Sequence, residues 1–194
     1  MIAKASSGIV KWLLHAGAIT ECDKELYEYA AYSFFFSLLP LGLVTILGGI
    51  SGMVLEGIIM ILPFMLIRKF SGGAHLESPG KCLIYSTLLL TTFLFIIRIV
   101  TVEHLVTIFT CFVTASAIQI FFCSPIDNEA RKLNEKEAFI FKMTARIMSL
   151  LFLTLYVILL SSGQLQLSIP IGGGIILTSV LQVPCFFTGK QSAT

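Results

Sequence analysis

Apolar residues run along most of this chain in long blocks, and short polar stretches separate the blocks. A helix needs about 20 predominantly apolar residues to cross a bilayer, and several blocks approach that length. The pattern therefore predicts an all-α, polytopic integral membrane bundle of about six membrane segments. The predicted segments are residues 29–49, 53–67, 83–101, 105–122, 143–161 and 167–187.

Prolines or glycines interrupt three of these segments, at Pro40, at Pro63 and at residues 172–174. Proline removes a backbone donor and kinks a helix, and glycine lowers helix stability. We therefore expect kinked or loosened helices at these positions. The segment 53–67 is short for a crossing, so its helix should extend into the flanking residues.

The first 28 residues have a different pattern, in which lysines are interspersed among apolar residues. Ala5, Ile9 and Leu13 recur at helical spacing and share one face. The pattern predicts an N-terminal amphipathic helix within residues 1–28. Two placements remain open: the helix lies on the membrane surface, or it packs on the bundle with a solvated outer side.

The composition strengthens the membrane assignment. Of the 194 residues, 56% are hydrophobic and 12% are charged, and the mean hydropathy is +0.93, whereas soluble domains carry roughly a quarter charged residues. We expect one integral membrane domain over residues 1–194, embedded in a lipid bilayer. The net charge of +2 is too small to indicate a nucleic-acid partner.

The basic residues are distributed unevenly over the predicted connections. Twelve of the thirteen Lys and Arg fall in the N-terminal region, in residues 68–82, in residues 123–146 or in the C-terminal tail, and Arg98 is the exception. Cytoplasmic loops of membrane proteins carry an excess of Lys and Arg. We therefore expect both termini and the two polar loops, 68–82 and 123–142, on the cytoplasmic side of a multi-pass cell-membrane protein.

The loop 68–82 holds the candidate chemistry, because it contains adjacent glycines, a histidine, a Pro-Gly pair and a cysteine. His75 and Cys82 are seven residues apart, which on a continuous helix would separate them by about 10.5 Å along the axis. Pro79 and Gly80 lie between them and favour a break in the helix. The spacing is therefore compatible with contact only because the helix is interrupted.

If the two side chains meet, the imidazole withdraws the thiol proton and leaves a nucleophilic thiolate. A helix N-terminus at Cys82 would also favour the thiolate. The thiolate would attack a peptide carbonyl to form a thioester, and His75 would protonate the leaving amine. Backbone amides near Gly72 and Gly73, or the Arg68 guanidinium, would then hold the developing oxyanion.

The other cysteines and histidines indicate no second site. His104 and Cys111 have the same seven-residue spacing, but an unbroken apolar helix is predicted between them. The five cysteines are scattered without a CxxC pattern, and the three histidines show no HExxH spacing. We therefore expect no disulfide framework, no metal and no cofactor.

The run Arg68-Lys69-x-x-Gly72-Gly73-x-His75, followed seven residues later by Cys82 at the head of an apolar segment, resembles the accessory gene regulator B family. These proteins are bacterial membrane endopeptidases that process the precursor of a cyclic quorum-sensing peptide. The length and the membrane layout are also similar to the family. The second polar loop departs from the family's pattern at residues 128–130.

The resemblance implies that Cys82 is the nucleophile and His75 its base, with Arg68 and Gly73 as supporting positions. The family removes the C-terminal part of the precursor through an acyl-enzyme thioester. A substrate cysteine then attacks the thioester, so the product is a cyclic thiolactone. Glu77 is a further candidate for the site because it is close in sequence.

A second hypothesis is a small membrane transporter or exporter of a peptide, without proteolytic chemistry. The interrupted segments resemble the broken helices of transporters, but the sequence contains no internal repeat. On the leading hypothesis the partners are the lipid bilayer and an amphipathic propeptide, which residues 2–28 would meet on the inner leaflet. By analogy with other small polytopic enzymes, we expect a homodimer.

Overall fold

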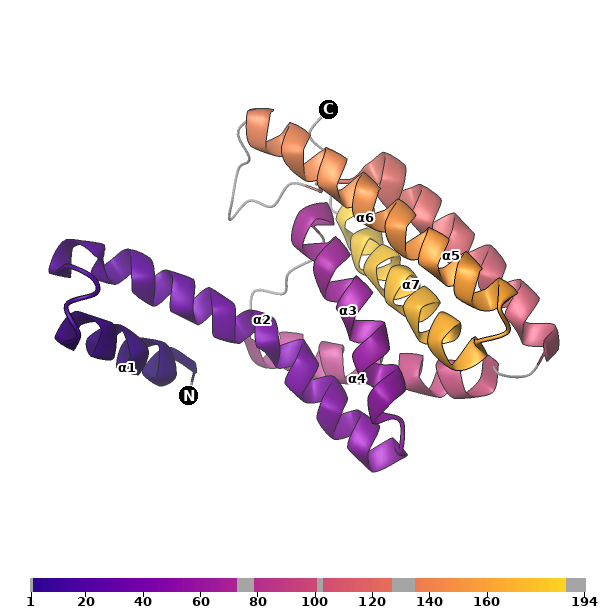
Figure 1. Cartoon of the computed structure of the whole chain (residues 1–194), viewed down its shortest axis with the longest axis horizontal. Coiled ribbons are helices and arrows are strands. Elements are labelled where there is room, and N and C mark those ends of the chain that lie inside the picture. Colours follow the sequence, from indigo (N-terminus) through magenta and orange to yellow (C-terminus); the bar gives the residue numbers. More distant parts are fainter. Residues whose placement is uncertain (1, 73–78, 101–102, 127–134, 188–194) are drawn as a thin grey trace. The chain divides into compact units, whose positions relative to one another are not determined.

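The computed structural model describes residues 2–72, 79–100, 103–126 and 135–187, and helices make up nearly all of these ranges (Figure 1). This confirms the predicted all-α class. The elements are α1 (Ile2–His15), the short 3-10 helix η1 (Glu21–Asp23), α2 (Lys24–Ser51), α3 (Val54–Ser71), α4 (Pro79–Val100), α5 (Glu103–Cys123), α6 (Glu135–Ser161) and α7 (Leu165–Phe187).

Within the described ranges, four helices are long and apolar enough to cross a membrane. Their apolar stretches are Leu83–Val100 in α4, Leu105–Cys123 in α5, Lys136–Ser161 in α6 and Leu165–Cys185 in α7. Helix α2 contributes a shorter apolar stretch, Leu38–Ser51, and α3 has 18 residues with charges near both ends. The protein is therefore a multi-pass membrane bundle, and the crossing of α2 and α3 stays a prediction.

The chain forms two compact units, Met1–Leu43 and Val44–Thr194. In the first unit, Ser6 and Val10 of α1 are buried, whereas Ile9 and Trp12 are exposed, Trp12 by 68%. The predicted N-terminal helix is present, and it has both a packed side and an exposed apolar side. An exposed apolar side is what a helix at a membrane surface requires.

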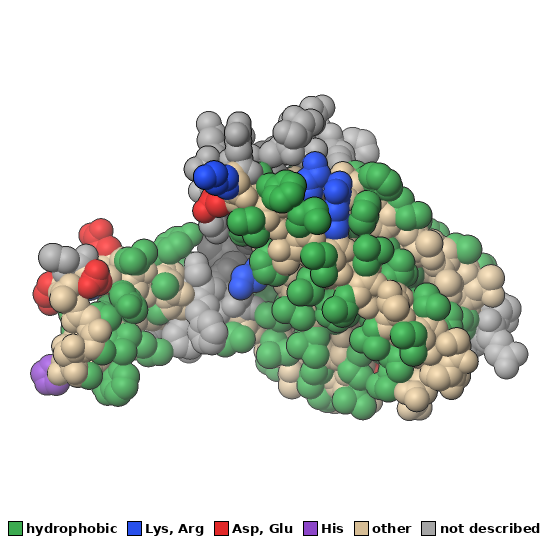
Figure 2. All heavy atoms as spheres, turned by 45° about the horizontal axis from the view of Figure 1, so that its top comes forward, with side chains coloured by type: hydrophobic (Ala, Val, Ile, Leu, Met, Phe, Trp, Pro, Cys, Tyr) green, Lys and Arg blue, Asp and Glu red, His purple; other side chains and the backbone are tan. Residues whose placement is uncertain are grey.

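Helix α7 is the centre of the second unit. It packs against α3, α4, α5 and α6, and Figure 1 shows it enclosed by these neighbours. Of its apolar stretch 72% is buried, compared with 17% to 28% for the stretches in α4, α5 and α6. The outer helices instead present large apolar side chains to the surroundings, and these cover most of the face in Figure 2. A bilayer is the solvent that such a surface requires.

The glycines of α7 allow this close packing and do not loosen the helix. A Cβ added at Gly172 would lie 2.8 to 2.9 Å from Val113, Phe109 and Tyr156, and one at Gly174 would overlap backbone and side-chain atoms of α3. Small residues let helix backbones approach closely in membranes. The expectation of a loosened segment at residues 172–174 is therefore wrong, and α7 is continuous.

Hydrogen bonds between side chains join the central helices. The Gln119 amide of α5 donates to the Ser179 carbonyl at 3.2 Å, and the Ser179 hydroxyl donates back to Gln119 Oε1 at 2.9 Å. The hydroxyl groups of Thr110 and Tyr156 lie 2.8 Å apart between α5 and α6. In a bilayer such pairs stabilise the association of helices because the polar atoms have no water to bind.

Candidate active site at the ends of α3 and α4

The helix boundaries shorten the predicted loop 68–82. Helix α3 continues through Arg68 and Lys69 to Ser71, and α4 begins at Pro79. Basic residues are favourable in the last turn of a helix, and proline is favourable at the first helical position. Pro79 and Gly80 therefore start α4 instead of bending the chain back within the loop, which corrects the predicted role of this pair.

The structure locates three of the six predicted site residues. Cys82 is the fourth residue of α4, so the predicted helix N-terminus at Cys82 is present. Arg68 lies in the last turn of α3, and Gly72 follows that helix directly. The remaining predicted residues lie outside the described part of the chain; they are Gly73, His75 and Glu77.

The second predicted loop is also shorter than residues 123–142, because α6 begins at Glu135. The first turns of α6, which carry Lys136 and Lys142, lie beside the end of α3. The rings of Phe70 and Phe141 meet there edge to face, with their centres 5.6 Å apart. Figure 2 shows Lys and Arg side chains gathered near this end of the unit. The described basic residues at this end are Arg68, Lys69, Lys136, Lys142 and Arg146.

Arginines at this end contact aromatic rings. The Arg68 guanidinium lies 5.5 Å from the centre of the Phe64 ring. The Arg146 guanidinium lies 4.7 Å from the Phe121 ring, and its Nε donates to the Phe121 carbonyl at 3.0 Å. Such contacts hold a guanidinium in place without removing its charge. The ends of α3 and α6 therefore supply fixed positive charge beside the two loops.

Gly72 ends α3 in a conformation that favours glycine. Its φ is 74° and its ψ is −161°, and its N–H donates to the Arg68 carbonyl at 3.1 Å. A Cβ at this position would overlap the carbonyl oxygen of Ile126. The chain therefore requires glycine at this position for two reasons: the backbone angle, and the close approach of the segment 124–126.

We predict that Gly72→Ala lowers the free energy of unfolding by at least about 1–3 kcal/mol, because the backbone strain and the overlap add. Thermal unfolding in detergent measures the loss. The matched control is Gly163→Ala, since Gly163 has a φ of 76° but no atom within 4 Å of an added Cβ. Equal losses for the two variants would mean that the contact with Ile126 contributes nothing.

A buried polar cluster at the same end was not predicted from the sequence. Ser71, Ser124 and Gln182 are 0%, 1% and 0% exposed. Gln182 Nε2 donates to Ser124 Oγ at 3.0 Å and lies 3.5 Å from the Ser71 carbonyl oxygen. The Ile126 N–H donates to that same carbonyl at 3.0 Å. Uncharged polar residues within apolar helices were the signal that could have indicated this cluster.

One atom of the cluster has no hydrogen-bond partner among the described residues, the Oε1 of Gln182. An unsatisfied buried acceptor costs about 1–3 kcal/mol. Native proteins retain few such atoms, so each one requires a physical explanation.

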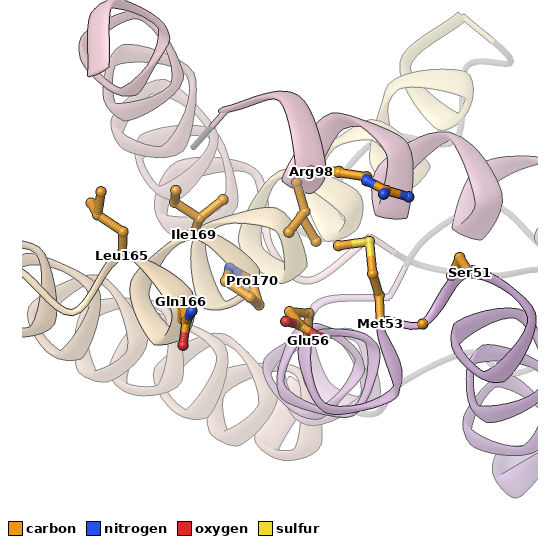
Figure 3. A pocket seen from close by; sticks show the side chains of 10 residues that line it. Ser51, Met53, Glu56, Arg98, Leu165, Gln166, Ile169 and Pro170 are labelled. Carbon is orange, nitrogen blue, oxygen red and sulfur yellow. The ribbon is translucent and has the colours of Figure 1, made fainter. Parts of the chain in front are cut away.

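A cleft of about 260 Å³ lies at the opposite end of the second unit (Figure 3). Glu56 of α3 and Arg98 of α4 both line it, together with Gln166 and Pro170 of α7. The structure therefore places these two opposite charges around one cleft. No described residue of either predicted loop lines this cleft.

Comparison with known proteins gives a match over nearly the whole chain. The family model described as "Accessory gene regulator B" matches residues 6–186. "Putative AgrB-like protein 2" of Clostridium perfringens strain 13 is 37% identical over 59 residues, which are 30% of this chain and 28% of the relative. "Putative AgrB-like protein 1" of the same strain is 37% identical over 75 residues, which are 37% of this chain and 40% of the relative.

The matches to these relatives are local, because the aligned part covers 28% to 40% of their lengths. No solved structure matches the chain.

Proposed function

The chain belongs to the accessory gene regulator B family, and from this we propose that it is a membrane cysteine endopeptidase acting on an amphipathic precursor peptide. Family membership gives the protein a role in accessory-gene-regulator quorum sensing, and the four long apolar helices make it a multi-pass membrane protein. The proteolytic chemistry, the substrate and the cytoplasmic location of the loop are our proposals.

The position of Cys82 is the observation that supports the chemistry best. Cys82 lies in the first turn of α4, where the backbone N–H groups have no partner within the helix. These groups and the helix dipole favour a thiolate over a thiol. Arg68 and Lys69 lie in the last turn of the preceding helix, so they add positive charge where the connection to α4 begins.

In the proposed first step, the Cys82 thiolate attacks a peptide carbonyl of the precursor. The carbon–nitrogen bond then breaks, and the imidazolium of His75 gives its proton to the leaving amine. The C-terminal part of the precursor departs, and the remainder stays bound to Cys82 as a thioester. The Arg68 guanidinium, in the last turn of α3, is suited to stabilise the oxyanion of this step, whereas the Gly72 N–H predicted for this role donates to the Arg68 carbonyl.

In the second step, a cysteine thiolate of the bound precursor attacks the thioester carbonyl. A new carbon–sulfur bond forms, the bond to Cys82 breaks, and the Cys82 thiolate is regenerated. The product is a thiolactone, and no oxidant or cofactor takes part. A site at the head of a membrane helix limits the access of water, which favours ring closure over hydrolysis.

The transporter hypothesis loses its main support in the structure. It depended on segments interrupted at Pro40, Pro63 and residues 172–174. Helices α2, α3 and α7 are continuous through these positions. Transporters of the broken-helix type bind substrate where helices unwind near the membrane midplane, and the described helices contain no such interruption.

The thioester provides a direct test of the proposed function. The purified protein in lipid vesicles is mixed with a panel of synthetic amphipathic peptides in which the internal cysteine is replaced by serine. Ring closure to a thiolactone is then blocked, so we expect an adduct on Cys82 that hydroxylamine releases, as it does thioesters. Intact-mass and peptide mass spectrometry measure the adduct. Cleavage without an adduct, or an adduct on another cysteine, would contradict the proposal.

A further inference from the structure

We propose that Gln182 is a positioning residue for the Cys82 site. Its buried amide joins the end of α3 to the start of the second polar loop, and it thereby sets where both loops leave the bundle. The inference rests on the proposed function, because it concerns the same site. Gln182 belongs to α7, the central helix, and lies in neither of the two polar loops.

Three segments converge on the last carbonyl group of α3. The Ser71 carbonyl accepts the Ile126 N–H at 3.0 Å, and the Gln182 amide lies within 3.5 Å of the same oxygen. The shorter contact of the amide is with Ser124 Oγ, at 3.0 Å. Carbonyl groups at a helix C-terminus have no partner within the helix. Here the second loop and α7 provide those partners.

Gln182 differs from Gln119 in how the polar atoms of its side chain are satisfied. Both polar atoms of the Gln119 side chain are satisfied by Ser179, in a reciprocal pair between α5 and α7. The Gln182 amide uses only its nitrogen, and its Oε1 has no partner among the described residues. A glutamine that served helix packing alone would be expected to satisfy both atoms.

The order of residues along the chain connects the contacts of Gln182 to the reacting groups. Ser71 precedes His75 by four residues, and α4 with Cys82 follows the same connection. Catalytic pairs depend strongly on distance, so a displacement of about 1 Å caused by a remote residue reduces a rate by as much as about 100-fold. Loss of the amide would remove the link from α7 to Ser71 and Ser124, and the Ile126 N–H would be left as the partner of the Ser71 carbonyl.

The test uses Gln182→Met, which keeps the length of the side chain and removes its hydrogen bonds. The probe is iodoacetamide, which needs no knowledge of the natural substrate. The rate of Cys82 alkylation is measured by mass spectrometry in vesicles from pH 5 to pH 10, for the wild type, Gln182→Met and the matched control Gln119→Met. Thermal unfolding of each variant is recorded in parallel.

We expect Gln182→Met to lower the alkylation rate at pH 7 by about tenfold or more and to raise the midpoint of its pH profile. Gln119→Met should lower the thermal stability by a similar amount and leave the midpoint unchanged. A general loosening of the bundle would shift the midpoint of the pH profile equally in both variants. A midpoint of Gln182→Met equal to that of the wild type would overturn the inference and leave the proposed function intact.

A second variant covers the case in which Gln182→Met does not fold. Ser124→Ala removes the hydroxyl that the amide contacts and adds no bulk. It should raise the midpoint in the same direction by a smaller amount, and an unchanged midpoint would overturn the inference. If the wild type itself reacts no faster at pH 7 than the His75→Ala variant, His75 is not the base of the proposed mechanism, and this inference fails with that role while cleavage through Cys82 is still tested by Cys82→Ala.

Discussion

Cys82→Ala should abolish cleavage of the precursor, with a fall in turnover of at least about 1,000-fold, because no other group supplies the nucleophile. The helix should remain intact, since alanine is the strongest helix former and Cys82 lies within the first turn of α4. Release of the C-terminal fragment in lipid vesicles, followed by mass spectrometry, gives the turnover. The proposal requires this loss to occur at unchanged thermal stability.

The chain offers two control cysteines for this experiment. Cys111 is an exposed residue of the apolar α5, and Cys123 lies at the end of that helix next to the second loop. Cys111→Ala and Cys123→Ala should retain turnover within about twofold, as surface substitutions usually do. If Cys82→Ala abolished cleavage but left the movement of a labelled peptide across the vesicle membrane unchanged, a transport activity would exist beside the proteolytic one. Full cleavage by Cys82→Ala would refute the cysteine mechanism.

His75→Ala should lower turnover by about 100- to 10,000-fold, the usual contribution of a general acid–base group. It should also raise the pH at which Cys82 reacts with iodoacetamide. A free cysteine has a pKa of about 8.5, and a neighbouring imidazolium lowers it. Since only the thiolate reacts, the wild type should reach its maximal rate at lower pH than the variant, and at pH 7 the variant should react more slowly.

Two other histidines serve as controls for the pH profile. His15 is exposed at the end of α1, and His104 is the second residue of α5. His15→Ala and His104→Ala should both leave the Cys82 profile unchanged. Identical profiles for the wild type and His75→Ala would remove His75 from the role of base, even if Cys82 proved essential.

Several features of the fold were predictable because their causes are local. Apolar length alone identifies α4, α5, α6 and α7, since a helix must satisfy its own backbone groups in a bilayer. The tendency of Gly to end a helix and of Pro to begin one accounts for Gly72 and Pro79. The helix of segment 53–67 extends into its flanking residues as expected, whereas α4 begins four residues before the predicted segment 83–101. Boundaries depend on capping contacts, and for Gly72 one such contact comes from Ile126.

The candidate nucleophile and its base could also be named from the sequence, because a cysteine, a histidine and two glycines in one short polar stretch are unusual between apolar segments. The structure adds that Cys82 lies in the first turn of a helix. The contact between His75 and Cys82 stays a prediction, as do the homodimer and the single-domain organisation.

By itself, then, the sequence determined the all-α membrane class, the family resemblance and the position of the candidate loop, since each depends on residues adjacent in the chain. Only the tertiary structure identified α7 as the central helix and showed that its Gln182 contacts Ser71 and Ser124. Ser124 and Gln182 are 58 residues apart, and Ser71 and Gln182 are 111 residues apart. No local pattern joins such residues; they meet because Gly172 and Gly174 let α7 pack closely among its neighbours, and only there do the buried polar atoms find partners.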